Sequence, residues 1–127
     1  MPLNESAEMY LETIYTLIRK NPAVRSIDVA EALNYSRPSV SRAVGLLKKD
    51  GYLLVNDEGF LVLTEKGTSA AEKIYERHTV LTAALMALGV DHESAAEDAC
   101  RIEHVISDKS LDAIKLHMSK YGRDSLQ

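Results

Sequence analysis

Apolar residues near the start of the chain recur with the spacing of one helix face. Between residues 7 and 20 they stand three and four positions apart, at Leu11, Ile14, Tyr15 and Ile18. Asn21 and Pro22 then interrupt the pattern, because the residue before a proline disfavours the helical conformation. The pattern therefore predicts a helix over residues 7–20 with one buried face.

Two shorter apolar patterns follow, joined by a tight connection at residues 34–36. The first predicts a short helix with Ser26 as its N-cap residue and with Ile27, Ala30 and Leu33 facing inward. The second begins with Pro38 in its first turn, where proline is favoured, and ends at Asp50 and Gly51. Its inward positions are Val40, Val44 and Leu47.

Two apolar runs, Tyr52–Val55 and Phe60–Leu63, flank a polar loop that contains Gly59, which indicates a β-hairpin. A helix, a helix-turn-helix and a hairpin in this order are typical of a winged helix-turn-helix domain. We therefore expect a mainly α fold, in which residues 1–72 form a winged helix-turn-helix DNA-binding domain with a small β-hairpin wing. The alternative is a small α+β domain without a role in DNA binding.

The second half, residues 73–127, predicts helices only. A long helix ends near Gly89, and two more are expected at about 93–107 and 110–121. Along the long helix a seam recurs at heptad spacing, at Ile74, His78, Leu81, Leu85 and Leu88. So short a helical segment cannot bury its apolar faces alone, so we expect an all-helical dimerisation domain and a homodimer.

Composition narrows the class of protein. The chain is 46% hydrophobic and 27% charged, has no apolar run long enough for a membrane span and begins without a signal-peptide pattern. Its single cysteine excludes an internal disulfide and fits a reducing compartment, so we expect a cytoplasmic protein without membrane partners.

The net charge of −4 is unevenly distributed. Residues 19–49 carry a local balance of +5, and residues 76–113 a balance of −5. A basic block followed by an acidic block favours phosphate contact by the first half and cation attraction by the second. The alternative is a patchwork surface on which the charges average out.

Three donor groups near the C-terminus, Cys100, Glu103 and His104, share one face of the expected helix at about 100° per residue. That face lies opposite the apolar one, and a solvated face is the simpler interpretation for the neighbouring Glu97. Cysteine is a poor choice for a solvated face. A thiol, a carboxylate and an imidazole at this spacing form half of a site for a borderline-soft divalent cation.

Met9, Glu12 and His78 extend this donor set, each with a simpler interpretation beside it. Met9 lies on the polar face of the first helix, one turn from Glu12, where a methionine is most often an incidental exposed side chain. Otherwise its thioether is a soft ligand. His78 lies on the apolar seam, where a lone histidine is more often a core residue than a ligand.

Three segments together resemble the diphtheria-toxin-repressor family of metal-dependent transcriptional repressors, in its short form without the SH3-like domain. They are Met9–Tyr15, Arg77-His78 and Ala99–Asp108, the last containing Cys-Arg-Ile-Glu-His. The resemblance covers essentially the whole chain. It implies a dimeric repressor that binds palindromic double-stranded operator DNA when Fe(II) or Mn(II) is present and controls metal-homeostasis genes.

The resemblance also implies metal ligands. Met9, Cys100, Glu103 and His104 match the activating site of iron-type members, Glu12 matches a ligand of manganese-type members, and His78 matches a histidine used by both. Residues 73–127 are thus expected to bind metal as well as to dimerise. The chain departs from the iron-type pattern at Thr82 and Ala96, where a second site would need a glutamate and a histidine.

The start of the third helix holds the candidate DNA contacts. Arg42 is the candidate for base readout, because arginine pairs bidentately with guanine. Pro38 is either a helix-start residue or, as the resemblance also suggests, a contact to a thymine methyl group. The full candidate set is Ser36, Arg37, Pro38, Ser39, Ser41, Arg42 and Lys48.

The sulfur donors favour Fe(II), Co(II), Ni(II) or Zn(II) over Mn(II), and Zn(II), Co(II) or Ni(II) could bind in vitro without being the physiological signal. We expect Fe(II), with Mn(II) next. Three rival functions remain: an enzyme with a Cys100–His104 pair, a redox-sensing repressor that oxidises Cys100, and a metal buffer. The enzyme lacks a third orienting group, so neither catalysis nor a small-molecule substrate is expected.

Overall fold

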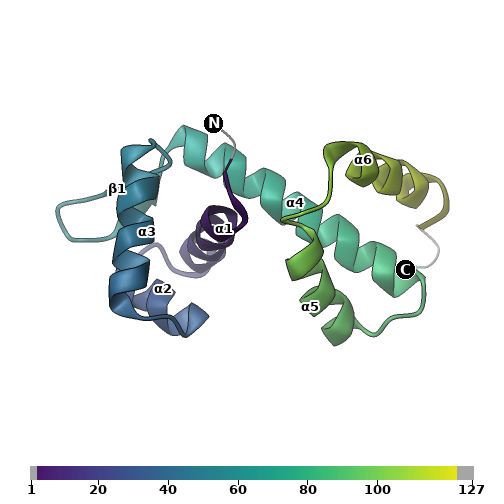
Figure 1. Ribbon diagram of the computed structural model, residues 1–127, viewed down its shortest axis with the longest axis horizontal. Coiled ribbons are helices and arrows are strands. Elements are labelled where there is room, and N and C mark those ends of the chain that lie inside the picture. Colours follow the sequence, from purple (N-terminus) through teal and green to yellow (C-terminus); the bar gives the residue numbers. More distant parts are fainter. Residues whose placement is uncertain (1–2, 123–127) are drawn as a thin grey trace. The chain divides into compact units, whose positions relative to one another are not determined.

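The computed structural model describes residues 3–122 and is mainly helical (Figure 1). Its described part contains six α-helices and one two-stranded antiparallel sheet. The chain forms two compact units, one up to Glu72 and one from Lys73 onward. None of the described helices is both long and apolar enough to cross a membrane. A mainly α chain with a hairpin is the fold class that the sequence predicts.

The N-terminal unit begins with α1 (Glu5–Lys20), which starts two residues earlier than predicted. The side chain of Asn4 caps it by accepting a hydrogen bond of 2.7 Å from the backbone N–H of Ala7. Tyr10, Leu11 and Ile14 are its buried residues. The apolar spacing thus forms the expected buried face, with Tyr10 added to it.

The next helix, α2 (Ser26–Leu33), corrects one prediction: Ser26 is its first residue and not its N-cap. The carboxylate of Asp28 reaches back and accepts a hydrogen bond of 2.8 Å from the backbone N–H of Arg25, which takes the cap position. The buried residues are Val29 and Ala30.

The third helix, α3 (Arg37–Lys49), follows after Asn34, which adopts a left-handed conformation with φ of 57°. Ser36 caps α3 by accepting a hydrogen bond from the N–H of Ser39 at 3.3 Å. Pro38 stands in its first turn, as predicted, and the predicted inward residues Val40, Val44 and Leu47 are buried.

The hairpin consists of β1 (Leu53–Val55) and β2 (Leu61–Leu63), each slightly shorter than its apolar run, with Leu53 opposite Leu63. Gly59 has a φ of +84°, as the tight loop requires. Gly67, in the first turns of α4 (Glu65–Ala87), passes so close to the hairpin that a Cβ there would lie 1.8 Å from the Tyr52 carbonyl oxygen.

The C-terminal unit contains the rest of α4, together with α5 (His92–Ile102), α6 (Asp108–His117) and a π-helical turn, Met118–Gly122. Leu81, Ala99 and Leu111 form its buried core. Helix α5 ends five residues before its predicted limit. Ser107 accepts a hydrogen bond from the N–H of Ser110 and so starts α6, and residues 103–107 form the connection.

Candidate metal centre and DNA-binding surface

The donor groups of the C-terminal unit lie where α5 ends. Cys100 belongs to the last turn, Glu103 is the C-cap residue and His104 follows it. One ligand atom from each of these three side chains lies within 4.8 Å of the others. Cys100 is exposed, whereas His104 has only 7% of its side chain exposed. The structure therefore brings together the three donors that the sequence singled out.

Glu103 is the unusual member of this group because its side chain is completely buried. Within the described residues, neither carboxylate oxygen accepts a hydrogen bond of normal geometry. Its nearest charged neighbours are two imidazoles, His104 Nε2 at 3.4 Å from Oε1 and His78 Nδ1 at 3.5 Å from Oε2. A buried carboxylate with only these two long contacts carries a desolvation cost, which a bound cation would offset.

The burial of Glu103 corrects the expectation that this face of the helix points away from the core. The prediction assumed a helix continuing to residue 107, but the chain turns at Glu103 and folds its side chain inward. The same turn leaves Val105 64% exposed. Glu97 is exposed, as a solvated position should be.

His78, on α4, has a pKa raised above its ordinary 6.5. The close approach of the Glu103 carboxylate as a hydrogen-bonding partner is the largest cause, partial burial of the imidazole opposes it, and the attraction of the negative charge adds to it. A cation in this position would compete with that proton, because a histidine ligand must be neutral.

Arg77 precedes His78 and holds the turn that carries the donors. Its Nη1 donates a hydrogen bond of 3.1 Å to the backbone carbonyl of Glu103, and its Nη2 pairs with the Asp108 carboxylate. Sequence reasoning assigned Arg77 no separate role. The two bonds fix residues 103–108 against α4.

Met9 and Glu12 belong to α1 of the N-terminal unit, and both are half-buried. The Met9 Sδ accepts a hydrogen bond from the hydroxyl of Tyr35 at 3.6 Å. Sequence reasoning missed Tyr35, since no pattern linked the turn before α3 to α1. The assignment of Met9 and Glu12 as metal ligands stays a prediction.

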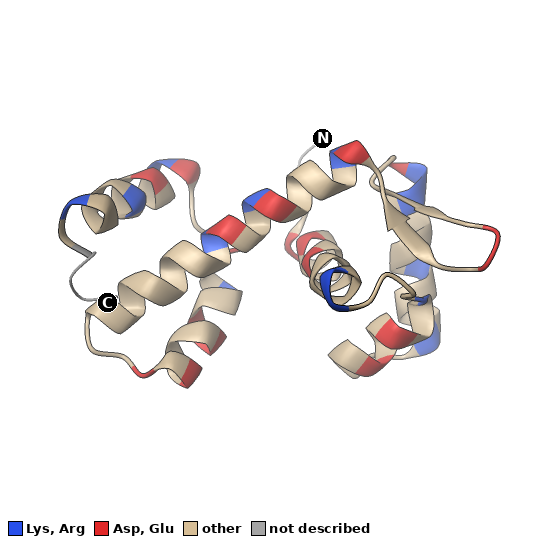
Figure 2. Ribbon diagram, turned by 180° about the vertical axis from the view of Figure 1, so that it is seen from behind, with Lys and Arg blue, Asp and Glu red and all other residues tan. Residues whose placement is uncertain are grey.

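The candidate DNA contacts lie on and just before α3, and all seven are exposed. Figure 2 shows Lys and Arg positions along α3 and acidic residues at the hairpin tip. Those acids are Asp57 and Glu58, which the sequence reasoning did not weigh. Arg25 donates a hydrogen bond of 3.1 Å to the Glu58 carbonyl and lies over the Phe60 ring, which attaches the loop to the N-terminus of α2.

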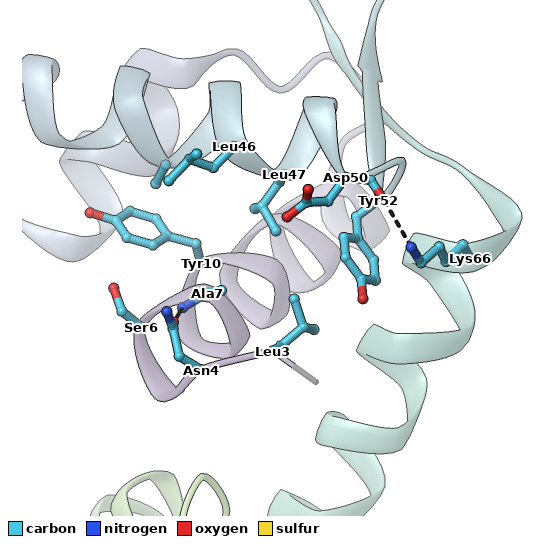
Figure 3. A pocket seen from close by; sticks show the side chains of 11 residues that line it. Leu3, Asn4, Ser6, Ala7, Tyr10, Leu46, Leu47, Asp50, Tyr52 and Lys66 are labelled. Carbon is cyan, nitrogen blue, oxygen red and sulfur yellow. Dashed lines mark hydrogen bonds between the residues drawn. The ribbon is translucent and has the colours of Figure 1, made fainter. Parts of the chain in front are cut away.

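A cavity of about 320 Å³ also lies in the N-terminal unit, between α1, α3 and the start of α4 (Figure 3). Tyr10, Leu47 and Tyr52 line it, and Lys66 donates a hydrogen bond of 2.8 Å to the Asp50 carbonyl at its edge. Sequence patterns did not predict it.

Two family models match nearly the whole chain. The N-terminal DNA-binding domain of iron-dependent repressors matches residues 2–59, and their metal-binding and dimerisation domain matches residues 64–125. The chain belongs to the iron-dependent repressor family. It is thus a metal-dependent transcriptional repressor of the diphtheria-toxin-repressor type and not an enzyme, as its sequence segments indicated.

Individual relatives agree with this membership. An uncharacterised HTH-type transcriptional regulator of Methanocaldococcus jannaschii is 36% identical over 123 residues, covering 94% of this chain and 97% of its own. The HTH-type transcriptional regulator MntR of Bacillus subtilis is 40% identical over 109 residues, covering 86% of this chain and 77% of its own.

Among solved structures, the manganese regulator SloR is similar with a TM-score of 0.78 and 28% identity over 94% of this repressor. The repressor spans 55% of the SloR chain. A manganese-dependent transcriptional repressor in complex with manganese gives a TM-score of 0.81 and 27% identity, covering 89% of this repressor and 52% of its own chain.

Proposed function

We propose that this repressor binds palindromic operator DNA as a homodimer when Fe(II) is bound, with Mn(II) as the next candidate, and controls genes of metal homeostasis. One observation carries the metal dependence: the buried Glu103 carboxylate has a thiol and an imidazole within 4.8 Å and no donor of normal hydrogen-bond geometry in the described residues. A divalent cation would bind this carboxylate more closely than the two imidazoles at 3.4 and 3.5 Å do.

The ligand set of the proposal is Met9, Glu12, His78, Cys100, Glu103 and His104. Cys100, Glu103 and His104 hold the ion from the end of α5, and His78 lies beside them on α4. Met9 and Glu12 stand three residues apart on α1, so they share a helix face and can reach the same ion. When bound, the ion supplies positive charge to the buried carboxylate and coordination bonds to both units.

The donor types support Fe(II) over Mn(II). A thiol and a thioether are softer than the oxygen and nitrogen donors that suit Mn(II). The similar protein SloR is a manganese regulator, which keeps Mn(II) as the competing choice. Zn(II), Co(II) and Ni(II) would bind in vitro, because affinity generally rises across the first-row series.

DNA recognition is assigned to the exposed start of α3. Arg42 reads a guanine edge, and Pro38 packs on a thymine methyl group. Ser36, Arg37, Ser39, Ser41 and Lys48 contact the backbone or neighbouring base edges. Arg42→Ala should therefore weaken specific binding more than binding to random-sequence DNA in fluorescence anisotropy. Equal losses would make Arg42 a phosphate contact only.

Dimerisation is assigned to the apolar side of the C-terminal unit. A hollow of about 530 Å³ there is lined by Leu81, Leu85, Ile102, Ile106 and Ile114, among others. Leu88, at its edge, is 82% exposed. An open apolar surface of this kind is unfavourable in water and supports burial against a second copy.

The mechanism follows from these assignments. Two copies of α3 must stand about one DNA turn apart, roughly 34 Å, to read both halves of a palindrome. Ligands drawn from α1 and from α5 restrict the angle between the reading unit and the dimerisation unit. The restricted dimer no longer has to select one spacing out of many when it binds, so its affinity for DNA rises.

The experiment is an anaerobic titration of DNA binding with Fe(II) and with Mn(II), each with and without chelator. The DNA is a fragment selected from a random library by the Fe(II)-loaded protein. The proposal expects tight binding with Fe(II), weaker binding with Mn(II), and loss of both on chelation. Binding that ignores the chelator would contradict it.

A redox-sensing repressor remains the second candidate because Cys100 is exposed. Such a sensor needs a reactive thiolate, but it needs neither the buried Glu103 nor the adjoining imidazoles. Loss of DNA binding on peroxide treatment, without any response to chelator, would favour it over metal control.

A further inference from the structure

Tyr35 occupies the last position before the cap of the recognition helix. The backbone places it there firmly: Asn34 has the left-handed conformation, and the N–H of Tyr35 donates a hydrogen bond of 3.1 Å to the carbonyl of Ala30. Ser36 follows directly and caps α3 through Ser39. Any displacement of Tyr35 therefore reaches the first turn of α3.

The side chain of Tyr35 is attached to α1 at two points, although 43% of the residue is exposed. Its ring meets the ring of Tyr10 edge to face, with centroids 6.0 Å apart and planes at 68°. Tyr10 is only 5% exposed and so is a fixed support. The hydroxyl donates to the Met9 Sδ at 3.6 Å.

We propose that Tyr35 is a positioning residue, whose hydroxyl orients the Met9 thioether for coordination and attaches that ligand to the start of α3. The inference rests on the proposed role of Met9 as a metal ligand. It goes beyond that role by naming a residue that touches no metal and that links the ligand to the DNA-reading helix within one unit.

The physical reason is the flexibility of methionine. Its side chain has three rotatable bonds, so an unheld thioether loses conformational freedom when it becomes a ligand. The sulfur has two lone pairs, of which the Tyr35 hydroxyl engages one and leaves the other for an ion. Because the ring is fixed on Tyr10, the hydrogen bond holds the sulfur before any ion arrives.

The test uses the full chain, with Co(II) and Mn(II) affinities measured under anaerobic conditions by competition with a chelating dye. Tyr35→Phe removes the hydroxyl and keeps the ring on Tyr10. It should lower the Co(II) affinity about threefold to tenfold, the usual effect of one lost hydrogen bond. Mn(II) affinity should change less than about twofold, because Mn(II) gains little from a thioether.

Two further variants make the result specific. Met9→Leu should lower the Co(II) affinity at least as much, and Tyr35→Phe should then add nothing, because the two changes remove one interaction. Tyr52→Phe, which removes another phenol hydroxyl from the same unit, is the matched control and should leave both affinities unchanged.

A readout on the metal-free protein completes the test. With ¹³C-labelled methionine methyl groups, the Met9 resonance, identified by its loss in Met9→Leu, should move toward the rotamer-averaged position in Tyr35→Phe. Equal losses for Co(II) and Mn(II), additive effects in the double variant, or an unmoved Met9 resonance would each overturn the role of Tyr35. If Met9→Leu alone leaves the Co(II) affinity unchanged, Met9 is not a ligand and the proposed ligand set fails with it.

Discussion

The two units differ in how completely they satisfy their own polar and apolar groups. In the N-terminal unit the caps of α1 and α3 are filled by Asn4 and Ser36, and the candidate DNA contacts are exposed to water. In the C-terminal unit Glu103 is buried beside two imidazoles, and an apolar hollow opens to the surface. The helix ends named in the first unit are satisfied by the chain itself. In the second unit, a bound ion would stabilise the buried carboxylate, and a second copy would cover the apolar hollow.

The largest effect is expected from Glu103→Gln, which keeps the side-chain shape and removes the charge. Metal affinity, measured by calorimetry, should fall more than about 100-fold, because a direct ligand is lost and outer partners alone account for 10- to 100-fold. At a pH above the raised pKa of His78, where the His78–Glu103 pair no longer contributes, the free energy of unfolding of the metal-free protein should stay the same or rise, since a desolvated charge disappears. A clear loss of metal-free stability would show that the carboxylate is already satisfied without metal.

A second substitution tests how closely the N-terminal unit is packed. Gly67→Ala should lower its stability by about 1–3 kcal/mol, because the new Cβ would meet the Tyr52 carbonyl oxygen at 1.8 Å and the backbone must shift.

The matched control is Gly45→Ala, in the interior of α3, where nothing lies within 4 Å of the added Cβ. It should raise stability by about 0.5–1 kcal/mol, the ordinary helical preference for alanine. Urea denaturation of both variants measures these changes in stability. Equal effects would show that α4 is not in close contact with the Tyr52 carbonyl at Gly67.

Substitutions at Arg77 test how the C-terminal unit holds its metal ligands. Arg77→Ala should lower the metal affinity about tenfold, as expected when a residue that orients ligands is removed. Arg77→Lys should recover part of the loss, because an ammonium can still donate to the Glu103 carbonyl. Arg101→Ala removes the same charge from an exposed position beside Cys100 and serves as the control. An equal loss in the control would assign the effect to net charge.

The smallest expected effect concerns pH in the metal-free protein. The pKa of His78 is raised by Glu103, so the pair contributes stability that is fully present below about pH 6.5 and is lost as the pH rises through the raised value. Because His78 is partly exposed, the change should be no more than about 1 kcal/mol. Thermal unfolding at pH 6 and pH 8 measures it, and Glu103→Gln should remove this dependence.

Sequence patterns predicted the elements well wherever one residue period ran without interruption. The periodic apolar positions of α1 and α3 gave their buried faces, and Gly59 marked the hairpin loop. The end of α5 was predicted wrongly because Ser107 caps a new helix, a competition that periodicity does not show.

The site was predictable in its donors but not in its environment. Cys100, Glu103 and His104 converge as their spacing indicated. The burial of Glu103 depends on the turn after α5, and the role of Arg77 on a hydrogen bond to a backbone carbonyl 26 residues away. The contact of Tyr35 with Met9 also joins distant segments, and such pairs leave no periodic signal in one sequence.

The proposed mechanism requires that ligands from α1 and from α5 hold the same ion. X-ray absorption at the cobalt edge tests it directly, because it counts the sulfur atoms bound to Co(II) in the protein. Two kinds of sulfur are expected in the native protein, one from Cys100 and one from Met9, with the Met9 contribution lost in Met9→Leu. An unchanged spectrum in Met9→Leu would mean that α1 does not reach the ion through its thioether, which would contradict Met9 as a ligand of that ion.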